Sequence, residues 1–320
     1  MKIGLVVLAL LIAGLGAWSF RDRIAVLSAP RKAAVAVRSD TAIKADELFW
    51  HTFHNGEYDD IPRALDALTA AYLRTPGDAK TAAHIAWLHN WRIAERARLT
   101  SVPATITGDT MLARRYFQEA VRLDPSDARY LGFLAGHTLA EGSLHQDERL
   151  TRTGYFQMLE AIERWPEFNL FTGGYVFSRL PATSPQFREG LEWQWETLDR
   201  CIEGQIDRAR PDYSAYMRLE TTDGAKRACW NSWIAPHNFE GFFLNMGDML
   251  VKSGDWQTAQ KIYANARLSR TYGSWKYQAV LDERIARAQA NVAAFNAADS
   301  PPNARVMIES PFACMGCHQQ

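Results

Sequence analysis

Residues 113–130 read ARRYFQEAVRLDPSDARY, and this stretch decides the fold class. Ala113, Phe117 and Ala120 recur at spacings of four and three residues, which places them on one face of a helix. The small residues allow a second helix to approach closely, and the aromatic ring fills the space beside them. Pro125 then ends the helix, because proline lacks a backbone N–H and clashes with the preceding turn. The stretch therefore predicts a helix packed along a neighbouring helix.

The same order of small, large, small and proline residues recurs along the chain. One further copy is Ala64, Leu68, Ala71 and Pro76, and a degraded copy is Gly154, Met158, Ala161 and Pro166. A fourth unit includes its preceding helix: Phe243, Met246, Gly247 and Leu250 come before a turn at Gly254, and Ala259, Tyr263 and Ala266 come after it. Such self-similarity indicates an array of repeated supersecondary units.

These units resemble the tetratricopeptide repeat family. Its two-helix unit has large, large, Gly and aromatic positions on the first helix and Ala, aromatic, Ala and Pro on the second, and residues 243–266 follow this order. They depart at Thr271, which stands in place of Pro, and the prolines of the earlier units lie further apart than the family's roughly 34 residues. The resemblance covers about half the chain. It implies a solenoid of helical hairpins whose concave face binds a peptide or protein partner.

The whole body between Asp40 and Asn296 keeps helical spacing of its apolar residues, without an alternating run long enough for a strand. The predicted fold class is all-α. Residues 170–239 are rich in aromatic residues and are interrupted by Gly and Pro, so an irregular insertion of short helices is expected there. The interrupting residues are Gly173, Gly174, Pro181, Pro185, Gly204, Pro211, Gly224 and Pro236.

The N-terminus carries an uncharged stretch from Ile3 to Phe20, long enough to span a bilayer as a helix. We expect an uncleaved signal anchor. A signal peptide is the alternative, although the small residues nearby make a poor cleavage site. Basic residues follow the span, and by charge alone they would keep the body in the cytoplasm. These residues are Arg21, Arg23, Arg31 and Lys32.

The C-terminal residues 312–320 read FACMGCHQQ and contain the Cys-x-x-Cys-His pattern of c-type haem attachment. Cys314 and Cys317 can each bond one vinyl group of the porphyrin, and His318 is then placed to ligate the iron. Chance would produce this pattern in roughly one in a thousand chains of this composition. Because c-type haem is attached outside the cytoplasm, we expect the body to face the periplasm, either anchored in the inner membrane or soluble after signal cleavage.

Three other interpretations of the motif stay open at this point. They are a Cys-x-x-Cys redox pair, half of a zinc site completed by Cys201 and Cys229, and a tail without function. A redox pair is typical of a βαβ context, and a four-cysteine zinc site uses a second close pair. Cys201 and Cys229 lie 28 positions apart and form either a disulfide or two buried thiols.

A tail of about twenty residues cannot enclose a porphyrin, so we expect it to fold back until the helical body covers the ring. The second axial position of the iron is open, and a vacant or water-bound position is one alternative. The candidate ligands are His237, in a loop beside Trp230, Trp233 and Phe239, followed by His51, His54 and Met246.

Composition narrows the function further. The chain of 320 residues has 36 Lys+Arg against 36 Asp+Glu, so no basic field favours nucleic acid as a partner. No Walker A, G-x-S-x-G or H-E-x-x-H motif occurs. The sequence predicts a monohaem c-type cytochrome that transfers electrons to a redox partner protein. The alternatives are a membrane-tethered scaffold for a peptide or protein, and a peroxidase-like haem enzyme or haem sensor, which would need a distal group that the sequence does not identify.

These predictions divide the chain into consecutive segments. They are the signal anchor or signal peptide (1–20), a basic linker (21–39), tetratricopeptide-like repeats (40–169), the irregular insertion (170–239), a further repeat with a final helix (240–296) and the haem-binding tail (297–320).

Overall fold

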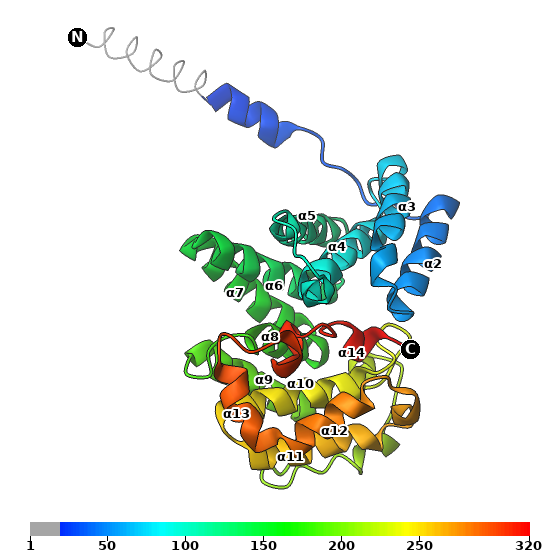
Figure 1. Cartoon of the computed structure of the whole chain (residues 1–320). Helices are drawn as coiled ribbons and strands as arrows, with labels where there is room; N and C mark the ends of the chain where they lie inside the picture. Colours follow the sequence, from blue (N-terminus) through cyan, green and yellow to red (C-terminus); the bar gives the residue numbers. More distant parts are fainter. Residues whose placement is uncertain (1–19) are drawn as a thin grey trace, which may run out of the picture. The chain divides into compact units, whose positions relative to one another are not determined.

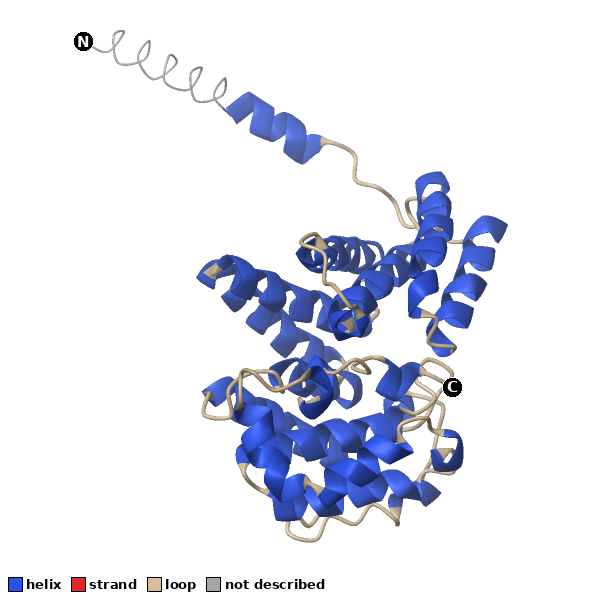
Figure 2. Cartoon of the chain, viewed as in Figure 1, coloured by secondary structure: helices blue, strands red, loops and turns tan. Residues whose placement is uncertain are grey.

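The computed structural model describes residues 20–320, and this part of the chain is helical without any strand (Figure 2). The all-α prediction is confirmed. The chain forms two compact units, Met1–Ala33 and Ala34–Gln320. In the first unit residues 20–28 are helical, so part of the predicted basic linker is a helix. The predicted apolar span lies outside the described residues except for Phe20, and among the helices of residues 20–320 none could cross a membrane.

Short connections join most of the α-helices of the larger unit (Figure 1). Their bounds are Asp40–His54 (α2), Ile61–Arg74 (α3), Ala79–Ala94 (α4), Ile106–Leu123 (α5), Ala128–His145 (α6), Glu148–Arg164 (α7), Pro166–Phe177 (α8), Pro185–Ile202 (α9), Asn238–Ser253 (α10), Trp256–Asn265 (α11), Gln278–Ala286 (α12), Ala288–Asn296 (α13) and Met315–His318 (α14).

Consecutive helices pack in pairs, α2 with α3, α4 with α5, α6 with α7, α8 with α9 and α10 with α11. Ala113, Phe117 and Ala120 are fully buried on α5, as their spacing predicts. Pro125 lies just beyond the end of α5, and Asp127 caps the next helix by accepting a hydrogen bond from the backbone N–H of Arg129. Proline therefore stops one helix and aspartate starts the next, which closes each hairpin onto its neighbour.

The prediction of short helices throughout residues 170–239 is wrong. This segment contains most of α8 and the 18-residue α9, which a loop at residues 178–184 connects, and its longer irregular part is residues 203–237. Gly174 does not break α8; it lets α9 approach, because a Cβ atom there would lie 2.7 Å from the carbonyl oxygen of Gly190. Glycine in a helix here serves packing between helices rather than a turn.

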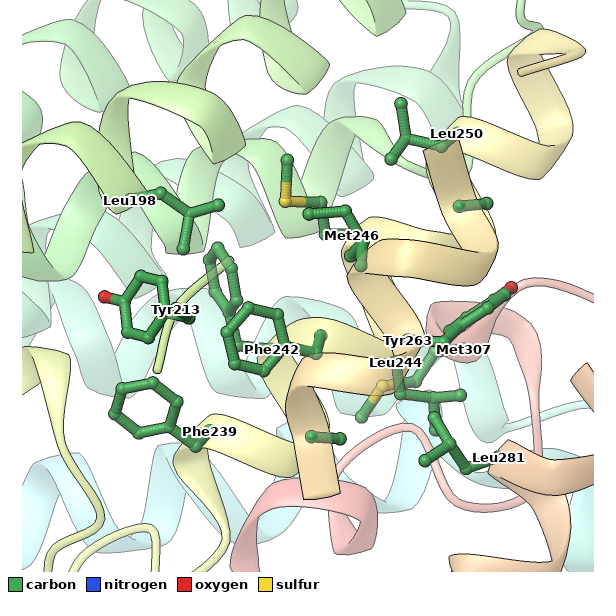
Figure 3. Packing of buried hydrophobic residues seen from close by; sticks show 14 of the residues in the cluster. Leu198, Tyr213, Phe239, Phe242, Leu244, Met246, Leu250, Tyr263, Leu281 and Met307 are labelled. Carbon is green, nitrogen blue, oxygen red and sulfur yellow. The ribbon is translucent and has the colours of Figure 1, made fainter. Parts of the chain in front are cut away.

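Two large apolar clusters fill the second unit. One lies in α2–α6 and includes Phe49 and Phe117, and the other lies in α9–α13 and includes Phe243 and Met246 (Figure 3). The C-terminal tail runs between them, with α14 lying between the early and the late helices in Figure 1. Cys314 packs in the first cluster and Cys317 in the second. The tail is therefore part of both cores.

A test of the hairpin packing is Gly247→Ala in α10. A methyl group there would overlap the ring of Tyr263 on α11, so we expect a loss of about 1–3 kcal/mol in the free energy of unfolding. The control is Gly108→Ala in α5, where nothing lies within 4 Å of the new Cβ and alanine favours the helix. Urea titration monitored by circular dichroism measures both. Equal stability of the two variants would contradict this account of α10 and α11.

Candidate functional site

The C-terminal motif is held by one buried carboxylate, that of Glu95 at the end of α4. Its Oε1 accepts hydrogen bonds from the backbone N–H groups of Cys314 (2.7 Å) and Met315 (2.8 Å). Its Oε2 accepts from Trp91 Nε1 (2.9 Å) and Arg98 Nε (2.6 Å). Burial raises the pKa of Glu95, whereas Arg98 and these hydrogen bonds oppose the rise. Glu95 thus joins the tail to the N-terminal helices.

Other elements hold the rest of the motif. The Tyr175 hydroxyl on α8 donates to the carbonyl oxygen of Ala313 (2.5 Å), and Trp275 Nε1 donates to that of Gly316 (2.8 Å). The backbone N–H of His237 donates to the carbonyl oxygen of Cys317 (3.0 Å). A Cβ atom on Gly241 of α10 would overlap the sulfur of Cys317. The expectation that the tail folds back onto the body is confirmed.

The docked motif lines a cavity of about 600 Å³, within the range of small-molecule and cofactor sites. Cys314, Cys317 and His318 all contribute to its wall. The rest of the wall is largely apolar and aromatic and comes from α2, α4, α6, α8, α10 and the loop before α10. Examples of these aromatic residues are Trp50, Phe53, Trp87, Phe171, Trp230 and Phe242.

The imidazole of His318 has a fixed orientation. Its Nδ1 lies 2.6 Å from the carbonyl oxygen of Ile234, so this nitrogen carries the proton and donates it. Burial lowers the pKa of His318 to about 4, so the ring is neutral at pH 7. Nε2 then keeps its lone pair, which is the arrangement of a metal-ligating histidine.

Both thiols of the motif are buried and unpaired. Burial raises the pKa of Cys317 to about 12 and that of Cys314 well above its ordinary value, so both stay protonated at neutral pH. Cys201 and Cys229 form a disulfide. The alternative of two buried thiols is wrong, and these sulfurs cannot complete a zinc site with the motif. Within residues 20–320 no three His, Cys, Asp or Glu side chains form a metal-binding group.

None of the four candidate second ligands lines the cavity. The His237 ring faces the Glu240 carboxylate (Nδ1 to Oε1, 3.3 Å), three residues along the chain. His51 is exposed beside Glu57, and His54 contacts the ring of Trp50. Met246 is fully buried in the apolar cluster around Phe243 (Figure 3). Local spacing in the sequence does not show which of these side chains reach the cavity.

A different histidine, His137 on α6, lines the cavity. Its Nε2 lies 3.0 Å from Asn90 Oδ1, and the amide nitrogen of Asn90 lies 3.8 Å from the sulfur of Cys314. Its Nδ1 is buried and has no hydrogen-bond partner in the described part of the chain. Trp50 Nε1 and Trp230 Nε1, also in the cavity wall, are buried without partners as well.

The sequence offered little signal for Glu95, Asn90 or His137. Glu95 lies 219 residues from Cys314 in the chain, and Asn90 lies 224 residues from it. No local periodicity reports a contact over such a separation. The available signal was weak. His137 lies in a largely apolar helical stretch, which is typical of a buried group with a specific partner, whereas Asn90 and Glu95 have charged or polar neighbours in the sequence.

Comparison of the chain with protein-family models, curated proteins and solved structures finds no match. The site is therefore interpreted from its own geometry.

Replacement of Glu95 tests the docking of the motif. Glu95→Ala leaves the backbone N–H groups of Cys314 and Met315 and the indole N–H of Trp91 without their acceptor. We therefore expect a loss of about 3 kcal/mol in the free energy of unfolding and faster proteolysis of the tail. The matched control is Glu160→Ala, which removes an exposed ion pair with Arg164 and should leave both measurements nearly unchanged. If the tail of Glu95→Ala resists protease as well as that of the wild type, contacts other than those of Glu95 are sufficient to dock the motif.

The buried histidine predicts a pH dependence of the chain without cofactor. Burial lowers the pKa of His137 to about 3, from 6.5 for an exposed histidine. Between these values the unfolded chain binds a proton that the folded chain does not, so stability falls as the pH falls. We expect His137→Leu to reduce the slope of unfolding free energy against pH by up to about 1.4 kcal/mol per pH unit from pH 6.5 downward. Urea titrations at several pH values measure this, and parallel slopes would contradict it.

Proposed function

We propose that the protein is a monohaem c-type cytochrome that transfers electrons outside the cytoplasm, with its haem held between the C-terminal tail and a tetratricopeptide-like helical body. The observation that carries the proposal is the position of Cys314, Cys317 and His318 in the wall of one cavity of about 600 Å³. The residues of the attachment motif are thus placed at a space of cofactor size.

The polarity of the cavity wall supports this proposal. Trp50 Nε1, Trp230 Nε1 and His137 Nδ1 are buried polar atoms without partners among residues 20–320. Leaving such a group unpaired costs about 1–3 kcal/mol, so a ligand that approaches them is favoured. The aromatic wall suits a flat apolar ring.

The charges of the wall agree with a ligand that carries carboxylates. Four arginines line the cavity, namely Arg96, Arg129, Arg179 and Arg227, against the two glutamates Glu167 and Glu309, and of the four Arg129 is paired with Asp127. A haem carries two propionate groups, and guanidinium is the side chain best suited to pair with carboxylate.

The roles of the tail residues follow from their chemistry. Each thiol would add to one vinyl group, with sulfur bonding one carbon and hydrogen going to the other, so this addition requires no oxidant. His318, held through Nδ1 by Ile234, would present Nε2 to the iron. The bound iron would supply a one-electron redox centre. The exposed ring of Trp233 in the cavity wall shows that the cavity reaches the surface, where a redox partner can approach.

The proposed location is the periplasmic side of the inner membrane, with residues 3–20 as the anchor, or the periplasm itself after cleavage. The Cys201–Cys229 disulfide supports an oxidising compartment, because such bonds are rare in reducing cytosol. The buried small and large positions at the hairpin contacts support the likeness to tetratricopeptide repeats.

Covalent attachment is the direct test. The full chain is co-expressed with the c-type maturation machinery, and the protein is examined by haem staining of a denaturing gel and by intact mass. We expect one haem per chain in the wild type and none in the double variant Cys314→Ala/Cys317→Ala. The control is the double variant Cys201→Ala/Cys229→Ala, which removes the other two cysteines. The fraction of this variant that folds should still stain for haem.

Unmodified wild-type mass, under conditions in which a control cytochrome matures, would overturn the proposal. It would favour the tethered scaffold for a peptide or protein partner.

A further inference from the structure

Two histidines line the same cavity, and they share one arrangement. His318 donates from Nδ1 to the carbonyl oxygen of Ile234, and its Nε2 has no hydrogen bond among the described residues. His137 contacts Asn90 Oδ1 through Nε2 (3.0 Å), and its Nδ1 is buried without a partner. In both rings one nitrogen is fixed by an oxygen acceptor and the other is free. A metal-ligating histidine has this form, since the acceptor fixes the tautomer and directs the lone pair.

The tautomer of His137 follows from its neighbours. Asn90 directs its amide N–H towards the sulfur of Cys314 (3.8 Å), which leaves Oδ1 towards the imidazole. An amide oxygen only accepts, so Nε2 carries the hydrogen and Nδ1 has the lone pair. The same Asn90 side chain links His137 to Cys314. Nδ1 of His137 therefore lies near any group that is bonded to Cys314.

The other buried histidines pair with carboxylates and lie away from the cavity. His84 faces the carboxylate of Asp46, His89 Nδ1 lies 2.7 Å from Asp109 Oδ1, and His237 faces Glu240. None of these three belongs to the cavity wall. Apart from His318, His137 is the histidine that the wall contains within residues 20–320.

We propose that His137 is the second axial ligand of the iron, bound through Nδ1, with Asn90 as the positioning residue that holds its Nε2–H. This inference rests on the proposed haem attachment. It assigns a six-coordinate iron with two histidine ligands, which suits electron transfer and opposes the binding of small external ligands such as carbon monoxide.

The test uses the full chain with its haem attached. The ferric wild type is expected to be low-spin by electron paramagnetic resonance, and the ferrous form is expected to bind carbon monoxide poorly. His137→Ala should turn the ferric signal to high-spin and let the ferrous form bind carbon monoxide. Added imidazole should restore the low-spin signal in this variant, because it can take the place of the missing ring. The matched control is His145→Ala, an exposed position on the same helix, which should retain the wild-type spectra.

A second variant separates ligation from a structural effect. His137→Met offers a thioether in place of imidazole, so the iron should stay largely low-spin while the midpoint potential rises above that of the wild type. A haem-loaded wild type that is high-spin, or a His137→Ala protein with the wild-type signal, would overturn the assignment of His137. A wild type without covalent haem would instead overturn the proposed function, so the two failures are distinguishable.

Discussion

The structure depends on one buried carboxylate, that of Glu95, which accepts hydrogen bonds from backbone N–H groups of the C-terminal segment. Glu95 accepts two N–H groups of the Cys-x-x-Cys-His segment with one oxygen and two side-chain donors with the other. A buried charge is stable only when its hydrogen bonds are satisfied, so Glu95 and the tail require one another. The tail then packs in both apolar clusters, with Cys314 in one and Cys317 in the other.

The cavity lies where the docked tail meets the helices of both clusters. Helices α2, α4 and α6 provide one part of its wall, α8, α10 and the loop before α10 provide another, and the tail completes it. Its aromatic surface is costly to hydrate, and its unpaired indole and imidazole nitrogens are costly to bury. Both costs fall when a flat ligand with polar edges is bound. A ligand that binds the folded chain and not the unfolded chain also stabilises the fold by mass action.

The packing of the helical hairpins explains how such a site can form. Small residues at hairpin contacts, such as Ala113 on α5 and Gly174 on α8, bring helices close and leave little room between them. Larger side chains such as Trp87 and Phe171 come from helices that are not paired with each other, and they meet around the cavity. A tetratricopeptide-like array would commonly offer a groove to a peptide. In this protein the C-terminal segment lies against the helical hairpins, and the Cys-x-x-Cys-His pattern is in that segment.

The sequence by itself determined the all-helical body, the stops at Pro76 and Pro125, and the Cys-x-x-Cys-His pattern, because each is encoded by spacing within a few residues. The break expected at Gly173 and Gly174 is wrong, because both lie inside α8, whereas Pro181 lies in the loop before α9. A glycine that serves packing cannot be told from one that serves a turn without its neighbour. The tertiary structure alone decided which groups meet the motif. Glu95, Asn90 and His137 reach it across more than 170 residues, and such contacts depend on how the hairpins stack rather than on any local pattern.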